Sequence, residues 1–179
     1  MEPLLHVVLP FTALVLGGVK PRKAAPLSIL GVLPDLDALF LVHRSISHSA
    51  IVLSLVWAFV LAIAYFVRPG YKKMAVLGLL VLLSHPVLDM MGGSTPILWP
   101  LLDTSIHLRL SLNGSVGGGV SISPRVEVIT TATVFQQVTS IDYPLFTGEG
   151  LMISLLLLTP MALNLLRGKR HTIIEQAVT

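Results

Sequence analysis

The chain contains no cysteine among its 179 residues. It can therefore form neither disulfide bonds nor thiolate nucleophiles nor cysteine-ligated zinc sites. Any metal site in this protein has to be built from histidine and carboxylate side chains.

Charged residues are also scarce, at 12% of the chain, whereas an ordinary soluble domain has about 25%. The mean hydropathy of +0.85 and the 54% share of hydrophobic residues argue against a soluble globular domain and against a disordered chain. The net charge of +3 is no sign of a nucleic-acid partner, because basic residues in membrane proteins commonly mark cytoplasmic loops.

Long apolar stretches predict an all-α, multi-pass membrane protein with about five helices. The stretches are Leu4–Val19, Ala24–Val42, Ala50–Val67, Met74–Met91 and Leu151–Leu166. Several are short for a hydrocarbon core of about 30 Å, which needs about 20 apolar residues. We therefore expect local thinning of the bilayer or some shallow segments.

Three clusters of basic residues predict the orientation of these spans. They lie within 20–23, 68–73 and 167–170, between or after alternate apolar stretches. The positive-inside rule places all three in the cytoplasm. The prediction is an inner (plasma) membrane protein with its N-terminus outside and its C-terminus in the cytoplasm.

The segment 92–149 has a different pattern, typical of β structure. Leu108, Leu110 and Leu112 alternate with polar residues, and Asn113-Gly114 is a turn signal. We expect a small antiparallel sheet of two to four strands on the outer side. The predicted regions are a membrane helical core with a metal site at 1–102, a β-rich insertion at 103–149, and a last helix with a basic tail at 150–179.

Histidine and aspartate residues gather in the outer halves of the predicted spans. Ionisable groups are costly in a membrane and indicate function by default. His85 and Asp89 are four residues apart and so project from the same helix face. Imidazole and carboxylate groups suit zinc or manganese, so we expect a site for a divalent ion such as Zn²⁺. The candidates are His6, Asp35, Asp37, His43, His48, His85 and Asp89.

Four motifs in order resemble the YdjM-like family of inner-membrane metal-dependent hydrolases. They are Leu33-Pro34-Asp35-Leu36-Asp37, the segment from His43-Arg44 to His48-Ser49, His85-Pro86-Val87-Leu88-Asp89, and the segment from Gly92 to Trp99-Pro100. The match covers roughly residues 1–102. The family is itself distantly similar to zinc-dependent phospholipase C and P1 nuclease.

The resemblance implies a metal-ligand set of His6, Asp35 or Asp37, His48, His85 and Asp89. The later histidine and glutamate that complete a three-metal cluster in the phospholipase C group have no counterpart by motif. Asp103, His107 or Glu149 could substitute for them. One or two metal ions are therefore the expectation.

The remaining site residues have competing interpretations. The histidines and Asp89 could instead form a hydrogen-bonded network between helices, and Asp35 and Asp37 could be turn or N-cap carboxylates. His43 is assigned a role behind the ligands or toward the substrate. Arg44 is assigned a phosphate contact, with a plain interfacial arginine equally open. Ser49 is either part of the same surroundings or only a helix cap.

The function predicted from these residues is a phospholipase-like, metal-dependent hydrolase of phosphoesters such as lipid head groups. Its partners would be the lipid bilayer and a phosphoester or phospholipid substrate. The catalytic group would comprise Arg44 and whichever of Asp35 and Asp37 does not bind the metal and so can act as general base. The alternative is a non-catalytic metal-binding or metal-transport membrane protein.

Overall fold

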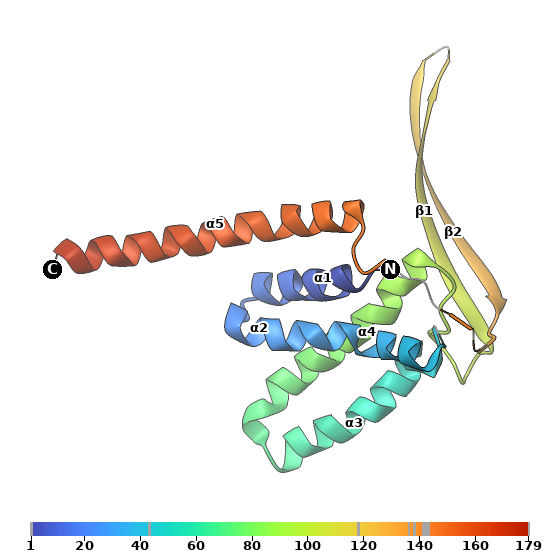
Figure 1. Cartoon of the computed structure of the whole chain (residues 1–179), viewed down its shortest axis with the longest axis horizontal. Coiled ribbons are helices and arrows are strands. Elements are labelled where there is room, and N and C mark those ends of the chain that lie inside the picture. Colours follow the sequence, from blue (N-terminus) through green and yellow to red (C-terminus); the bar gives the residue numbers. More distant parts are fainter. Residues whose placement is uncertain are drawn as a thin grey trace.

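The structure is a computed structural model that describes residues 2–42, 44–117, 119–135, 137, 139–140 and 144–178, the last helix beyond residue 163 by its backbone only. Its helices and strands follow one another along the chain (Figure 1). They are α1 (Pro3–Leu16), α2 (Pro21–Ser28), the 3-10 helices η1 (Ile29–Phe40) and η2 (Ile46–His48), α3 (Ala50–Phe66), the 3-10 helix η3 (Pro69–Tyr71), α4 (Lys72–Gly92), β1 (Thr104–Val116), β2 (Val120–Ala132) and α5 (Gly148–Val178).

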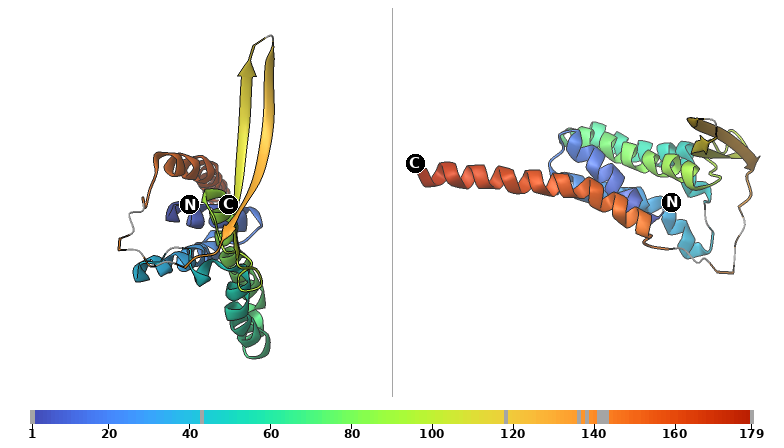
Figure 2. Two further views of the ribbon diagram at one scale, coloured as in Figure 1. Left: turned by 90° about the vertical axis from the view of Figure 1, so that its right-hand side faces the viewer. Right: turned by 90° about the horizontal axis from the view of Figure 1, so that it is seen from above.

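Helices α1 and α4 run antiparallel through the helical body. The first turns of α1 meet the last turns of α4, where His6 contacts Asp89, while Leu14 and Val81 lie further along in one buried cluster with Ala24 of α2. η1 packs on both α1 and α4, and α3 packs on α4. Helix α5 lies beside α1 and then extends away from the rest of the chain (Figure 2).

An antiparallel hairpin of two strands stands at the opposite end of the molecule from the C-terminus (Figure 1). Both strands lie within 103–149, where the sequence predicts β structure, and an antiparallel sheet is confirmed. The turn expected at Asn113-Gly114 is wrong, because Asn113 pairs with Ser123 and Gly114 with Ile122 inside the ladder. The pairing continues to Val116 and Val120, so the chain reverses in the glycine-rich segment that follows β1.

The prediction of a multi-pass, all-α membrane protein with five spans is wrong. Among the described residues, only the helical segment Pro69–Gly92 is both long and apolar enough to cross a membrane. The 14 residues of α1 span only about 21 Å at 1.5 Å per residue, short of a core of about 30 Å. The orientation predicted from alternating spans loses its basis with them.

The second apolar stretch shows most clearly why hydropathy overcounted the spans. Ala24–Val42 is divided between α2 and the 3-10 helix η1, which contains Pro34. Proline removes a backbone donor and crowds the preceding turn, which disfavours a regular α-helix around Pro34. η1 then ends at Leu41, whose φ of 57° is left-handed. The broken backbone brings Asp35 and Asp37 against the other helices instead of carrying them across a bilayer.

Gly31 allows η1 to approach α1 closely, and its replacement by alanine is expected to destabilise the fold. A Cβ at this position would lie 2.2 Å from the backbone oxygen of His6, so one of the two segments must move. Overpacking of this kind costs about 1–3 kcal/mol in unfolding free energy. Thermal unfolding in detergent measures the effect. Gly70→Ala is the matched control because an added Cβ there meets nothing within 4 Å. Equal stability of the two variants contradicts the packing argument.

Candidate metal centre

Four side chains from three separate elements converge in the buried region between η1, η2 and α4. They are Asp35, His48, His85 and Asp89, and one ligand atom from each lies within 4.8 Å of the other three. His48 Nε2 and His85 Nε2 are 3.1 Å apart. Asp35 Oδ1 lies 3.6 Å from His48 Nε2 and 3.5 Å from His85 Nε2, and Asp89 Oδ2 lies 3.4 Å and 3.9 Å from the same two atoms.

This spacing fits a tetrahedral metal ion. Nitrogen and oxygen ligands about 2.0–2.2 Å from zinc lie about 3.3–3.6 Å apart at the corners of a tetrahedron. Five of the six distances, 3.1 to 3.9 Å, bracket that value, and the sixth, between the two carboxylates, is within 4.8 Å. One oxygen of Asp35, Oδ2, is buried and has no hydrogen-bond partner. Two imidazoles and two carboxylates, one of them with an unpartnered buried oxygen, are a donor set that suits a divalent cation.

Hydrogen bonds at the far side of each imidazole point its Nε2 toward the group. His85 Nδ1 lies 2.6 Å from the backbone oxygen of Gly31. A carbonyl only accepts, so Nδ1 carries the proton and Nε2 keeps its lone pair. His48 Nδ1 lies 3.2 Å from Asp37 Oδ2. Such outer contacts fix the tautomer and orientation of metal-binding histidines. A backbone carbonyl leaves no trace in sequence, so the part played by Gly31 could not be predicted.

The sequence does not distinguish the roles of Asp35 and Asp37, but the structure places the two residues differently. Asp35 belongs to the four-atom group, whereas Asp37 lies behind His48 and accepts from Ser45 N and Ser47 Oγ, each at 2.9 Å. Burial raises the pKa of Asp37, but hydrogen bonds from His48 and Ser45 outweigh burial and lower that pKa to about 2. Asp37 is therefore a carboxylate that supports His48. Ser47, directly before His48, was not singled out from the sequence.

Asn substitutions at Asp35 and Asp37 are expected to differ in severity. Asp37→Asn removes only a supporting contact of His48, and loss of such a partner typically weakens metal binding about 10–100-fold. Asp35→Asn removes a member of the group itself and is expected to weaken binding further. Competition with a chromophoric chelator measures both affinities. A weaker affinity in Asp37→Asn than in Asp35→Asn would reverse the assignment.

His6 lies against the group without joining it. Its Nε2 is 3.2 Å from Asp89 Oδ1, the carboxylate oxygen opposite the one that faces His48. Its ring stacks on His85 at a centroid distance of 4.0 Å, and its buried Nδ1 has no hydrogen-bond partner. The structure therefore places this predicted ligand beside Asp89, where it orients the carboxylate.

Arg44 lies beside the group, on the side of the segment that joins α4 to β1. Its Nε lies 3.3 Å from Asp89 Oδ2, and its Nη1 donates to the backbone oxygen of Ser94 at 3.4 Å. A Cβ on Gly93 would lie 2.0 Å from Nη1, so a side chain at that position would displace the guanidinium from this place. His48, His85 and Asp89 are fully buried, while the side chains of Asp35 and Arg44 are 15% and 17% exposed. Asp35 and Arg44 are thus the members of the site that a ligand can reach from solvent.

Without a metal, a proton occupies the centre of the group. Burial lowers the pKa of His48, but hydrogen bonds to Asp35, Asp37 and Asp89 outweigh it and raise that pKa to about 10. A metal ion must displace this proton, since a coordinating imidazole nitrogen is deprotonated. Metal affinity is therefore expected to rise with pH between 6 and 8, by about tenfold per pH unit for one released proton. Calorimetric titrations in buffers of different ionisation enthalpy count the proton. An affinity independent of pH contradicts this account.

The other predicted residues lie elsewhere. Ser49 caps α3 by accepting from Val52 N and donates to the backbone oxygen of Trp99, as expected of a helix cap. His107 sits in β1 opposite Ile129, and Glu149 is in the first turn of α5. Neither these two nor Asp103 belongs to the four-residue group found among the described residues. His43 lies outside the described residues, so its predicted role stays a prediction.

Among the comparisons with known proteins, only a family model matches the chain. No curated protein and no solved structure matches it, so the distant similarity to phospholipase C and P1 nuclease is not supported. A family model described as "YdjM inner membrane protein" matches residues 1–135. That range contains η1, η2, α4 and the whole hairpin, and so every residue of the candidate metal centre. The chain belongs to the YdjM inner membrane protein family.

Proposed function

We propose that the protein is a metal-dependent hydrolase of phosphoesters that acts on lipid head groups at the membrane. The observation that carries the proposal is the arrangement at the buried group. Two imidazoles and two carboxylates lie at the mutual spacing of metal ligands, and an arginine lies beside them on the side open to solvent. A cation site next to a guanidinium suits an anionic, phosphate-bearing substrate.

Zinc is the ion that we propose, with manganese as the second choice. A site of two nitrogen and two oxygen donors suits zinc in tetrahedral geometry, and manganese prefers more oxygen ligands in an octahedral arrangement. Asp35, His48, His85 and Asp89 would hold the ion. Its coordination would have to expand to a fifth ligand, a water or phosphoryl oxygen, and the ion would then supply Lewis acidity, lowering the pKa of that water and polarising that oxygen.

The protein groups have separate tasks in the proposed hydrolysis. A water oxygen bonds to phosphorus, the bond from phosphorus to the leaving alcohol oxygen breaks, one water proton passes to a carboxylate, and the leaving oxygen takes up that proton to become the alcohol. Asp35 faces the histidines through Oδ1, and its Oδ2, which has no hydrogen-bond partner, is the proposed acceptor. The same residue would then bind the ion and accept the proton, instead of the separate base expected from the sequence. Asp37, with a pKa lowered to about 2, is too weak a base for this role. Arg44 binds the phosphoryl oxygens and stabilises the charge that develops on them.

Two facts favour a lipid over a soluble phosphoester. The family is one of inner membrane proteins, and α4, which carries His85 and Asp89, belongs to the segment that is long and apolar enough to cross a membrane. Both residues lie in the last two turns of α4. A site near the end of such a helix lies near the head groups and would reach a phospholipid without extracting it.

Release of phosphate or of a phosphorylated head group from mixed micelles tests the proposal. Zinc-loaded protein is compared with metal-stripped protein and with His48→Ala over a panel of anionic and zwitterionic phospholipids. We expect turnover only in the loaded wild type. A protein that binds zinc but hydrolyses none of the panel faster than the stripped sample would contradict the proposal and favour the binding or transport alternative.

A further inference from the structure

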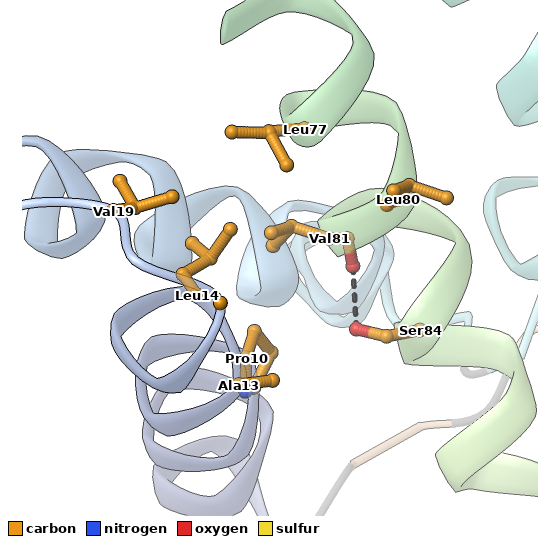
Figure 3. Close-up of a pocket in the computed structure, with 9 residues that line it drawn as sticks. Pro10, Ala13, Leu14, Val19, Leu77, Leu80, Val81 and Ser84 are labelled. Carbon is orange, nitrogen blue, oxygen red and sulfur yellow. Dashed lines mark hydrogen bonds between the residues drawn. The ribbon is translucent and has the colours of Figure 1, made fainter. Parts of the chain in front are cut away.

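An apolar groove runs between α1 and α4. The part of it farther from the metal centre is a cavity of about 240 Å³. Figure 3 shows Leu14 and Pro10 of α1 on one side of it, and Leu77, Leu80 and Val81 of α4 on the other. The one hydroxyl on the α4 wall, that of Ser84, donates to the backbone oxygen of Val81 at 2.6 Å (Figure 3). The wall therefore presents apolar groups to an occupant.

A second cavity continues this groove toward the metal centre. It shares Pro10, Ala13, Leu80 and Ser84 with the first cavity and extends it to Leu88. From Leu77 to Leu88 the groove follows α4 for about 16 Å at 1.5 Å per residue. That length matches one leaflet of a bilayer, about half of a hydrocarbon core of about 30 Å.

One end of the groove lies about one helical turn from His6 and His85. Pro10 lies one helical turn from His6 on the same face of α1, and Val81 lies one turn from His85 on the same face of α4. Leu88, at the end of the second cavity, lies at the same height on α4 as Asp89, on the neighbouring face of the helix. A molecule with an anionic group at Arg44 and a long apolar tail would thus have its tail at the mouth of this groove.

We propose that the groove holds one acyl chain of a phospholipid whose phosphate lies at the metal centre. This inference rests on the proposed function and narrows its substrate to lipids with a long chain next to the phosphate. The match in length to one leaflet and the continuity with the cluster point to a lipid chain. A protein helix in the same place would leave the anion site at its end without an occupant.

A third apolar cavity, separate from the groove, supplies the matched control. It lies between α3 and α4, is lined by Ala58, Ala62, Tyr65 and Val76, and has Lys72 at its rim. It is at the end of α4 remote from His85 and Asp89. Ala13 and Ala62 are both exposed alanines inside a helix, so tryptophan at either position fills one cavity and leaves the other unchanged.

Photolabelling in detergent with a trace of phospholipid that carries a diazirine near the end of its acyl chain tests the proposal. Zinc-loaded wild type, Ala13→Trp and Ala62→Trp are irradiated, and the labelled peptides are mapped by mass spectrometry. We expect saturable labelling of the stretches 9–17 and 77–88. It should fall at least fivefold in Ala13→Trp and stay within twofold of wild type in Ala62→Trp.

Three outcomes overturn the inference: labelling equally dense on the α3 cavity, equal loss in both tryptophan variants, or labelling that excess unlabelled phospholipid does not compete away. The photolabelling does not need turnover, so its result is independent of the hydrolase proposal. If the groove is labelled and no head group is released, the lipid site stands and the catalytic proposal fails. If head groups are released and the groove is unlabelled, only the acyl-chain site fails.

Discussion

His85→Ala is expected to reduce metal affinity by at least about a hundredfold, the largest effect in this protein. Loss of a supporting partner alone costs about 10–100-fold, and His85 would contribute a ligand atom that lies 3.1 Å from His48 Nε2. Asp89→Ala is expected to act similarly, because Asp89 contacts His6, Arg44 and His48 as well. Equilibrium competition with a chelator measures the affinity of each purified variant.

The control for this loss is His107→Ala. His107 is a histidine of the hairpin, outside the four-residue group, so its removal is expected to leave metal affinity unchanged. Circular dichroism and thermal unfolding of the metal-free proteins separate loss of a ligand from loss of the fold. If folded His85→Ala binds zinc as tightly as His107→Ala, the four residues form a structural network between helices and not a metal site.

Arg44→Ala is expected to lower turnover of a phospholipid substrate by about a hundredfold. A charge-assisted contact to a transferring phosphoryl group typically contributes a few kcal/mol to its transition state. Metal affinity is expected to hold, because the variant keeps all four members of the group and loses a neighbouring positive charge. Steady-state kinetics together with metal content distinguish the two effects.

Arg44→Lys is the conservative variant that separates charge from shape. An ammonium group cannot reproduce the planar fork of a guanidinium, so we expect only part of the activity to return. A plain interfacial arginine would tolerate lysine fully and show little change with alanine. Full activity of a metal-loaded Arg44→Ala protein would remove Arg44 from the mechanism and leave the metal centre untouched.

The sequence predicts which residues belong to the site better than it predicts how they are arranged. His85 and Asp89 share a helix face by spacing alone, and α4 is indeed a regular helix through both residues. The roles of Asp35 and Asp37 could not be divided, because they depend on the 3-10 backbone of η1 after Pro34. An α-helix and a 3-10 helix direct residues two positions apart differently, and no local pattern distinguishes the two.

Hydropathy overpredicts membrane spans because it counts apolar residues and not continuous helix. Ala24–Val42 is as apolar as a span, yet α2 gives way to the 3-10 helix η1 at Ile29, and η1 ends at the left-handed residue Leu41, so no continuous α-helix forms. The hairpin turn was misplaced for a related reason. Asn113-Gly114 is a strong local signal, but cross-strand pairs from Leu112 opposite Pro124 to Val116 opposite Val120 hold it inside the ladder.

Metal content per chain is the measurement that tests the central claim most directly. Protein purified without chelator, exchanged into metal-free buffer and analysed by inductively coupled plasma mass spectrometry is expected to hold about one divalent ion, most of it zinc, as one four-ligand site requires. A double variant, His48→Ala with His85→Ala, is expected to hold less than about a tenth of that. Wild-type protein with no more metal than the double variant, after incubation with zinc and removal of excess, would contradict the claim that these four residues form a metal centre.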